Sequence, residues 1–315
     1  MPRVSVIVPA FDAAATVEET LQSVVAQTFD DWEVVLTDDG SRDGTAELAG
    51  AVDPRVRVLP AGRSGGPARA RNLAISQARG ELLAFLDADD LWLPDYLGSQ
   101  TETFDVAQSA SGSVGVVACD ARLLGPGGLQ RGTYRDHAPF PEPLTLARLL
   151  ESNPVFISAL SPRAVVEKVG GFDPLATFGA EDHNLWIKIM ERGYRIVYNP
   201  RPVAVYRVGA SSMSSSLVGM SRTSQEVYRL ALQRGRLNPL ERRVASRSLR
   251  LQRAVDDVEC LIDDRMARRS PLAIARAARG GLVFLLFAAR HPERWPRWAK
   301  ALLGGRATLW RPELR

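Results

Sequence analysis

Short apolar runs alternate with stretches of helical periodicity over the first 90 residues. The first run, Val4 to Val8, is continuous and rich in β-branched residues, which is typical of a strand buried on both faces. Strands are predicted at residues 4–8, 32–37, 55–60 and 82–86, and helices at residues 14–27, 44–51 and 66–79. This succession predicts an α/β domain with a mostly parallel sheet and right-handed crossovers.

Polar clusters follow three of the predicted strands, at residues 9–12, 38–41 and 87–90. Ligands of open α/β sheets bind beyond the carboxyl ends of the strands. The three clusters are therefore expected to form a ligand site at one edge of the sheet.

The turn Asp87-Ala88-Asp89-Asp90 places carboxylates close together after a buried strand. These groups repel one another unless a cation joins them. Mg²⁺ or Mn²⁺ suits the turn, because such ions bind through one or two carboxylates and complete their shell with water and phosphate oxygens. A solvated acidic turn that caps the next helix is the alternative when the turn is considered alone.

A second acidic pair, Glu181-Asp182, precedes the apolar residues Leu185, Trp186 and Ile189 at helical spacing. By spacing alone the pair marks the start of a helix, where the positive end of the helix dipole stabilises carboxylates.

Composition places the 315-residue chain among soluble globular proteins, since 45% of its residues are hydrophobic and 24% are charged. This excludes a disordered, collagen-like or multi-span membrane protein. Two cysteines, Cys119 and Cys260, are too few for a disulfide framework or a thiolate zinc site. The apolar run at residues 4–8 is too short for a signal peptide, so a cytoplasmic location is expected.

Charge is distributed unevenly along the chain. Residues 1–224 have a formal net charge of −7, and residues 225–315 have a net charge of +11. The acidic part argues against nucleic acid as a partner, and any attraction to phosphate-rich surfaces is expected in the basic tail.

Six segments occur in an order and spacing that resemble those of the family 2 glycosyltransferases, which are inverting enzymes with the GT-A fold. They are PAFD, DDGSRDGT, GGPARARN, GELLAFLDADDLWLPD, GGFD and AEDHNLW, within residues 3 to about 215. The resemblance implies a Rossmann-like GT-A catalytic domain at residues 1–220, with a nucleotide-sugar and metal half at 1–100 and an acceptor half at 101–220. A basic α-helical C-terminal extension is expected at residues 221–315.

The resemblance implies that a nucleotide-sugar donor lies across the strand ends. Pro9, Ala10 and Phe11 would line the base, with Phe11 stacking on it. Asp39 would hydrogen-bond the base, although an Asp-Gly turn with local caps is the alternative for this position. The family normally has Asn where this chain has Asp12, which leaves the role of Asp12 open.

The same resemblance assigns the phosphate and metal contacts. Arg71 would lie near the diphosphate, where its guanidinium offers fixed donors to phosphate oxygens. The alternative is that Arg69 and Arg71 are exposed helix charges. Asp89 would hold Mn²⁺ or Mg²⁺, Asp87 would bind the metal or the ribose, and Ala88 would let the backbone approach the sugar phosphate.

On the acceptor side, the resemblance implies that Asp182 is the base that deprotonates the attacking hydroxyl. Glu181 would raise the pKa of Asp182 by repulsion, or would bind the acceptor. His183 and Trp186 are further expected acceptor contacts. Gly209 stands where many members have a His near the metal, which leaves open whether a third protein ligand exists.

Together these implications predict a metal-dependent, inverting glycosyltransferase. It would move a sugar from a nucleotide diphosphate sugar, with UDP expected, to a hydroxyl of a glycan or lipid-linked saccharide in cell-envelope or polysaccharide synthesis. One alternative is a sugar-phosphate nucleotidyltransferase, although PAFDAAAT lacks the basic residues which that class carries in its first loop. Another is a non-catalytic module that binds a nucleotide or a carbohydrate, for which Gly209 is the hint.

The basic tail contains an apolar run at residues 282–289, with arginines and tryptophans around it. This run is less than half of the roughly 20 residues that a membrane span needs, so an interfacial helix within residues 270–315 is predicted. It would bring the active site to the inner face of the cytoplasmic membrane. Packing on the catalytic domain or in a homodimer is the alternative.

Overall fold

The computed structural model describes residues 1–62, 65–175, 179–208 and 217–262. Its contacts divide the chain into two compact units. The first unit comprises Met1–Pro174 and Glu181–Val208, and the second comprises Leu175–Ala180 and Gly209–Arg315.

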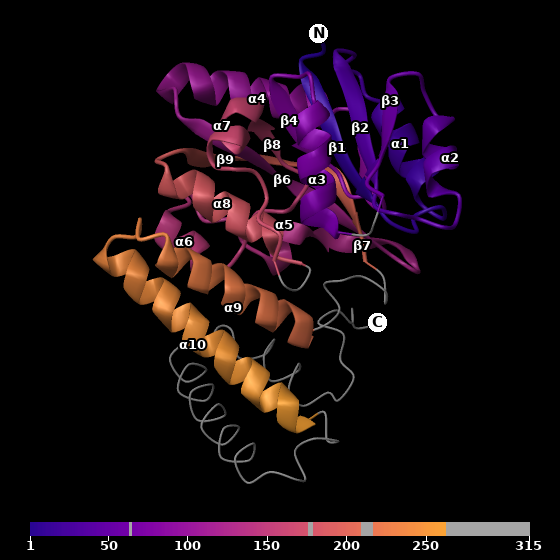
Figure 1. Cartoon of the computed structure of the whole chain (residues 1–315). Coiled ribbons are helices and arrows are strands. Elements are labelled where there is room, and N and C mark those ends of the chain that lie inside the picture. The colour runs from indigo at the N-terminus through magenta and orange to yellow at the C-terminus, as the bar shows by residue number, and fades with distance from the viewer. Residues whose placement is uncertain (63–64, 176–178, 209–216, 263–315) are drawn as a thin grey trace. The chain divides into compact units, whose positions relative to one another are not determined.

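The first unit opens with the predicted alternation of strands and helices (Figure 1). The elements are β1 (Val4–Ala10), α1 (Val17–Val25), β2 (Trp32–Asp38), α2 (Thr45–Gly50), β3 (Val56–Pro60), α3 (Pro67–Gln77) and β4 (Leu82–Phe85). The four strands are parallel and lie in the order β3-β2-β1-β4. The predicted helices extend beyond the observed ones by one to three residues at each end, where helical hydrogen bonds are weakest.

The rest of the first unit completes a nine-stranded sheet of mixed direction. Its elements are β5 (Leu91–Trp92), α4 (Tyr96–Ser111), β6 (Val114–Gly125), β7 (Gly128–Thr133), α5 (Tyr134–His137), α6 (Leu146–Leu149), β8 (Leu160–Pro162), α7 (Arg163–Lys168), α8 (Glu181–Glu191) and β9 (Arg195–Arg207). The sheet order is β3-β2-β1-β4-β8-β6-β9-β5, and β7 pairs with β6. Because β8 is antiparallel to both β4 and β6, the parallel half of the sheet ends at β4.

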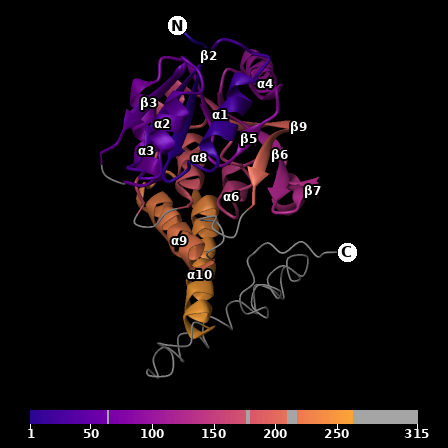
Figure 2. The same ribbon diagram turned by 90° about the vertical axis from the view of Figure 1, so that its right-hand side faces the viewer.

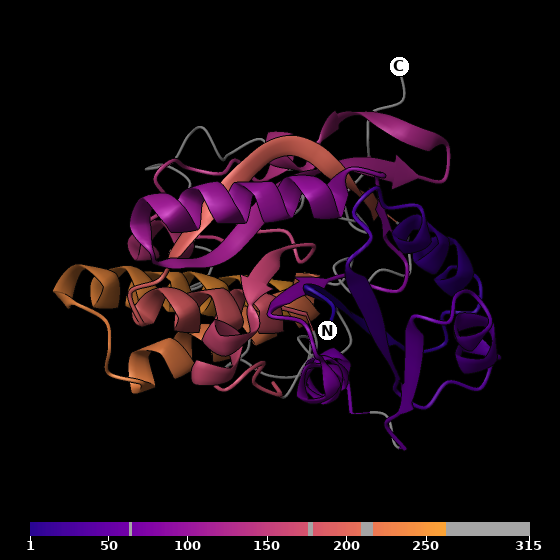
Figure 3. The same ribbon diagram turned by 90° about the horizontal axis from the view of Figure 1, so that it is seen from above.

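Helices cover both faces of this sheet. Figure 3 shows α4 along one side of the sheet and α3 with α8 along the other. The apolar positions Val17, Leu21 and Val24 of α1 are fully buried, as their spacing predicts. Coverage of both faces explains why Val4, Val6, Ile7 and Val8 of β1 are all fully buried, with no alternation of buried and exposed positions.

The helices described in the second unit are α9 (Leu217–Gln233) and α10 (Pro239–Ile262), which pack against each other (Figure 2). Val227, Ala231 and Ala245 are fully buried in this unit. The helical nature of the C-terminal extension is thus as predicted, while the predicted boundary between residues 220 and 221 falls inside α9.

The predictions for Gly209 and for residues 270–315 lie outside the described residues. Among the helices that the structure describes, none combines the length and the apolar character needed to cross a bilayer.

Candidate active site

The carboxyl ends of β1, β2 and β4 lie side by side in the parallel half of the sheet. Ala10 and Asp38 are register partners at the ends of β1 and β2, and the Asp39 N–H donates to the Ala10 carbonyl at 2.8 Å. β4 ends beside Ile7 of β1, so the acidic turn at residues 87–90 follows from the neighbouring strand. The three polar clusters are therefore brought to one edge, as predicted.

Asp12 connects the first two of these clusters. Its backbone N–H donates to Ser41 Oγ at 2.9 Å, and its Oδ1 accepts from the Arg42 N–H at 3.0 Å. Asp12 has a φ of 46°, a left-handed conformation that Asn and Asp adopt more readily than other side chains. The position left open by the sequence thus has a structural explanation, since Asn or Asp can occupy it.

Phe11 and Asp39, both predicted to contact the base, differ in exposure. Phe11 is 54% exposed, whereas Asp39 is only 4% exposed. The Asp39 carboxylate accepts hydrogen bonds from the backbone of Gly65 at 2.9 Å and of Gly66 at 2.7 Å, and so shapes the loop that enters α3. The predicted contact of Asp39 with a base stays a prediction.

The acidic turn is held by α1. The hydroxyls of Thr16 and Thr20 donate to the Ala88 carbonyl at 2.8 and 3.0 Å. Within the turn, the Asp90 N–H donates to the Asp87 carbonyl at 3.1 Å. Ala88 itself is buried, so the backbone of this turn has little freedom to move.

Arg207, at the end of β9, holds the same turn from another direction. Its backbone N–H donates to Asp90 Oδ1, and its Nε donates to the Asp89 carbonyl, both at 2.8 Å. Its Nη2 pairs with Glu19 of α1 at 2.8 Å. Sequence reasoning assigned no role to Arg207, and the one signal was its place two residues before Gly209, where a third metal ligand was considered.

The carboxylates of the turn fit a divalent cation. One oxygen each of Asp87, Asp89 and Asp90 lies within 4.8 Å of the others. Asp90 Oδ2 is buried and has no hydrogen-bond partner among the described residues, although a buried acceptor normally has one. Burial, with the charges of Asp89 and Asp87, raises the pKa of Asp90 well above its usual value.

Asp89 is exposed, but the protein around it still desolvates its carboxylate. This desolvation and the charge of Asp87 raise the pKa of Asp89 to about 6. The turn thus concentrates negative charge that a hard cation would neutralise.

Arg71 connects the acidic turn to the start of α8. Its Nη2 lies 2.6 Å from Asp87 Oδ1, and its Nη1 lies 2.6 Å from Glu181 Oε1. Burial alone would lower the pKa of Arg71, but the charges of Asp87 and Glu181 outweigh it and raise that pKa. Arg71 is 2% exposed, so it is not an exposed helix charge, and its expected contact with a diphosphate stays a prediction.

Asp182, the predicted base, follows Glu181 at the start of α8. Its Oδ2 accepts from Asn153 Nδ2 at 3.0 Å, and its Oδ1 accepts from the His183 N–H at 2.6 Å. Burial and the charge of Glu181 raise the pKa of Asp182 to about 7. Asp182 therefore changes charge near neutral pH, as a general base requires.

Two predicted acceptor contacts lie in the core instead. His183 is 4% exposed, its Nε2 lies 2.8 Å from the Leu149 carbonyl, and burial lowers its pKa to about 4. Trp186 is fully buried, with its ring centroid 6.0 Å from that of Phe85. The structure does not bring these side chains to the site, and Glu181 is occupied by Arg71.

Comparison with known proteins places this geometry in a family. The model of Glycosyl transferase family 2 matches residues 5–160. TuaG of Bacillus subtilis (strain 168), assigned as a teichuronic acid biosynthesis glycosyltransferase, is 31% identical over 234 residues, which cover 72% of this chain and 88% of TuaG. WfaP of Escherichia coli, named a UDP-Glc:alpha-D-GlcNAc-diphosphoundecaprenol beta-1,3-glucosyltransferase, is 27% identical over 220 residues, or 69% of this chain and 81% of WfaP.

Among solved structures, the chain is similar to the mannosyltransferase PcManGT from Pyrobaculum calidifontis in complex with GDP-Man and Mn²⁺. The two are 26% identical with a TM-score of 0.65, over 98% of this chain and 87% of that one. This likeness confirms the predicted GT-A fold with its helical C-terminal region. The family match and the extent of the likeness to TuaG confirm the predicted glycosyltransferase activity, and the chain belongs to glycosyl transferase family 2.

Proposed function

We propose that the chain transfers a sugar, with inversion, from a nucleotide diphosphate sugar to a hydroxyl acceptor. The observation that carries this proposal is the connection, through the Arg71 guanidinium, of the acidic turn after β4 to the acidic pair that opens α8. A carboxylate cluster suited to a cation and a carboxyl group that titrates near neutrality thus belong to one connected site.

On the donor side, Asp87, Asp89 and Asp90 are the side chains that would hold Mn²⁺ or Mg²⁺. Such an ion, when bound, stabilises the negative charge that develops on the leaving nucleoside diphosphate. The fit rests on the spacing of the three carboxylates and on the unpartnered oxygen of Asp90. The Mn²⁺ in the PcManGT complex supports the same assignment.

For the base of the donor, we assign Phe11 as a stacking surface, with Pro9 and Ala10 beside it and Asp39 as a hydrogen-bond acceptor. The exposure of Phe11 at the strand end supports stacking, because a ring that receives a base must reach solvent. The link from Asp12 to Ser41 and Arg42 keeps the two base-side loops together.

On the acceptor side, Asp182 would act as the general base. The acceptor oxygen attacks the anomeric carbon while its proton passes to the Asp182 carboxylate. The bond from that carbon to the diphosphate oxygen breaks, and the nucleoside diphosphate leaves from the opposite side. Attack opposite the leaving group inverts the anomeric configuration.

A UDP-sugar and a lipid-linked saccharide are the proposed donor and acceptor classes. The reaction named for WfaP supports both. The GDP-Man of PcManGT indicates that the fold itself does not select the nucleotide.

The exposed charge of the second unit supports contact with an anionic membrane surface. Within residues 221–256, every charged side chain that is exposed is an arginine: Arg222, Arg229, Arg236, Arg242, Arg243, Arg247, Arg250 and Arg253. The acidic residues of that range, Glu226, Glu241 and Asp256, are only partly exposed. A basic residue near an anionic bilayer contributes about 1 kcal/mol, and a lipid-linked acceptor would be found there.

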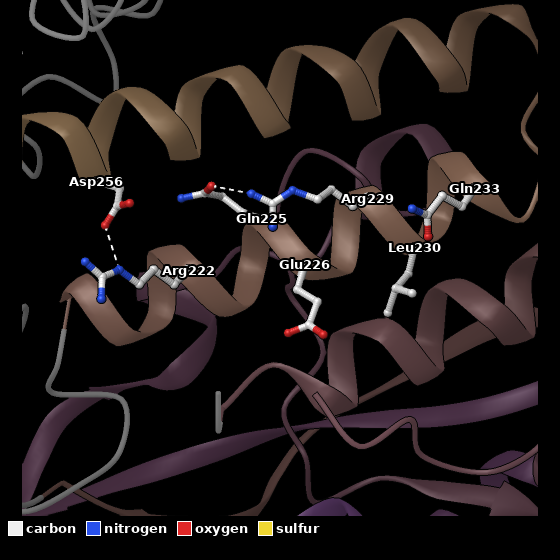
Figure 4. Close-up of a pocket in the computed structure, with 7 residues that line it drawn as sticks. All are labelled: Arg222, Gln225, Glu226, Arg229, Leu230, Gln233 and Asp256. Carbon is white, nitrogen blue, oxygen red and sulfur yellow. Dashed lines mark hydrogen bonds and ion pairs between the residues drawn. The ribbon is translucent and has the colours of Figure 1, made fainter. Parts of the chain in front are cut away.

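A hollow of about 540 Å³ in the second unit does not belong to the proposed catalytic site. Its lining residues come from α9 and α10, and Arg222 pairs there with Asp256 at 3.0 Å (Figure 4). They carry both signs of charge and include none of the carboxylates described above. We assign this hollow no part in the reaction.

Turnover of a panel of UDP-, GDP- and dTDP-sugars by the full chain, with and without Mn²⁺, tests the proposal. We expect Mn²⁺-dependent release of a nucleoside diphosphate from a subset of the panel. Nucleotide binding without turnover would identify a non-catalytic module. Pyrophosphate exchange would identify a nucleotidyltransferase, and either result would contradict the proposal.

Membrane contact is tested separately, by co-sedimentation of the full chain with vesicles of phosphatidylglycerol and phosphatidylcholine. We expect binding that weakens with salt and falls at least about tenfold in an Arg243→Glu, Arg250→Glu variant, since exposed charges act over roughly 8 Å at physiological ionic strength. The same binding to pure phosphatidylcholine would contradict an electrostatic contact.

A further inference from the structure

The guanidinium of Arg71 lies between two carboxylates from distant parts of the chain. Each of its terminal nitrogens donates to a different residue at 2.6 Å, one to Asp87 and the other to Glu181. The side chains of Arg71, Glu181 and Asp87 are 3%, 8% and 28% exposed. This group is therefore largely shielded from water, where charge-assisted hydrogen bonds are strong.

Arg71 is itself held in place by its surroundings. The Phe172 ring lies 5.2 Å from the Arg71 Cζ, within the range of a cation–π contact. The next residue of α3, Asn72, donates to the Phe172 carbonyl at 2.7 Å and accepts from the Phe172 N–H at 2.9 Å. The helix, the loop at residues 170–173 and the guanidinium thus form one packed group.

The planar guanidinium of Arg71 fixes the distance between the carboxylates of Asp87 and Glu181. Its N–H donors point in fixed directions, whereas the ammonium of Lys is a single point charge on a flexible stem. Asp87 begins the acidic turn, and Glu181 is the first residue of α8. A shift of either carboxylate would break a short, shielded ion pair and leave a charge without its partner, which is costly.

We propose that Arg71 is a positioning residue that fixes Asp182 relative to the acidic turn, by holding Asp87 and Glu181 on one guanidinium. This inference rests on the proposed function, because it takes Asp89 as a metal ligand at the donor and Asp182 as the base. It differs from the predicted contact of Arg71 with the diphosphate. In the present role Arg71 acts on the reaction through two carboxylates.

The consequence for the reaction is geometric. The base and the leaving diphosphate must lie on opposite sides of the anomeric carbon, and an error of about 1 Å in such an arrangement costs about a hundredfold in rate. Asp182 follows Glu181 directly, so the position of Glu181 at the start of α8 determines the position of the Asp182 carboxylate. Loss of the two ion pairs of Arg71 should therefore lower the rate of the chemical step more than the affinity for the nucleotide.

A double-mutant cycle on the full chain tests this role. The variants are Arg71→Lys, Glu181→Gln and the combination, and Arg69→Lys is the matched control, because Arg69 is exposed on the same helix. Three quantities are measured: turnover of the nucleotide sugar selected by the panel above, UDP affinity with Mn²⁺ by calorimetry, and the free energy of unfolding in urea without metal or nucleotide.

We expect each single variant to lower kcat at least about tenfold and to change UDP affinity less than about threefold. The kcat of the combined variant should be no lower than that of the poorer single variant, because the effects of residues that act as one unit are not additive. Glu181→Gln should also move the acid limb of the pH–rate profile to lower pH, because the charge of Glu181 raises the pKa of Asp182. Arg69→Lys should change none of these quantities.

Two results would overturn the inference while the proposed function stands. One is a loss of UDP affinity of tenfold or more in Arg71→Lys with kcat unchanged, which would make Arg71 a donor ligand. The other is coupling in the unfolding free energies with additive effects on kcat, which would make the ion group purely structural. A wild-type chain that turns over no member of the panel would instead refute the proposed function, and this inference with it.

Discussion

The acidic turn after β4 and the acidic pair that opens α8 contain the same residue types in different surroundings. In the turn, α1 and Arg207 bond mainly to backbone carbonyls, and the carboxylates of Asp87, Asp89 and Asp90 are left close to one another. In the pair, Glu181 forms an ion pair with Arg71, and burial together with the charge of Glu181 raises the pKa of Asp182 to about 7. The first arrangement suits a cation and the second suits a proton.

This difference indicates that burial and partners, more than residue type, separate the proposed metal ligand Asp89 from the proposed base Asp182. Burial is the largest cause of the raised pKa in both Asp89 and Asp182. Around Asp89, further carboxylates could share a cation that keeps them ionised. Arg71 pairs with both Asp87 and Glu181, so it does not by itself distinguish the two groups. Asp182 lies outside the carboxylate cluster of the turn and accepts from Asn153 and the His183 N–H, so a proton is the species proposed to bind and leave there.

Replacement of the proposed base, Asp182, is expected to have the largest effect. Asp182→Asn keeps the shape of the side chain but removes its basicity, so donor turnover should fall at least about a hundredfold. UDP affinity with Mn²⁺ should change less than about threefold, because the acidic turn is untouched. Steady-state kinetics and calorimetry measure the two quantities, with the exposed Asp30→Asn as control. An Asp182→Asn enzyme as active as the parent would refute the assignment.

Replacement of a carboxylate in the acidic turn should instead lower UDP affinity in the presence of Mn²⁺. Asp89→Ala removes one carboxylate of the cluster, so UDP affinity in the presence of Mn²⁺ should fall at least about tenfold, while affinity without the metal stays unchanged. Calorimetry with and without Mn²⁺ measures this difference. Equal Mn²⁺ enhancement in Asp89→Ala and in the parent chain would show that the turn is a solvated acidic turn only.

The pH dependence of turnover tests the raised pKa of Asp182 without a mutation. As the proposed base, Asp182 would act in its ionised form, and burial with the charge of Glu181 raises its pKa to about 7. The rate at saturating donor and Mn²⁺ should therefore be constant well above pH 7 and fall about tenfold per pH unit well below it. A profile that stays flat down to pH 5 would contradict the raised pKa of Asp182.

The same raised pKa predicts a stability effect. Between the usual pKa of an aspartate, near 4, and about 7, the folded chain holds a proton at Asp182 that the unfolded chain has lost, so this group stabilises the fold less as pH rises through that window. Asp182→Asn should accordingly melt at a higher temperature than the parent at pH 8.

The smallest expected effect concerns Trp186. Because Trp186 is fully buried beside Phe85, Trp186→Phe should lower the free energy of unfolding by about 1–2 kcal/mol and leave turnover within about twofold. Urea unfolding and steady-state kinetics measure the two quantities. Unchanged stability with lost turnover would instead support the acceptor contact predicted from sequence.

The sequence by itself determined the elements of the first 90 residues, the edge at which the polar clusters meet, and the family. Apolar spacing reports burial along a short stretch of chain, so it located the segments from β1 to β4 with small errors at their ends. The carboxyl ends of parallel strands share one edge whatever the side chains are, which is why the clusters at residues 9–12, 38–41 and 87–90 were expected together.

Only the tertiary structure decided which side chains meet and which are buried. The contacts of Arg71 with Asp87 and Glu181 depend on how α3, β4 and α8 pack, and spacing along the chain carries no record of that packing. His183 and Trp186 were expected at the acceptor because they adjoin the acidic pair. Eight of the eleven residues of α8 are buried, and His183 and Trp186 are among them, so closeness to Asp182 in the sequence does not bring a side chain to the site.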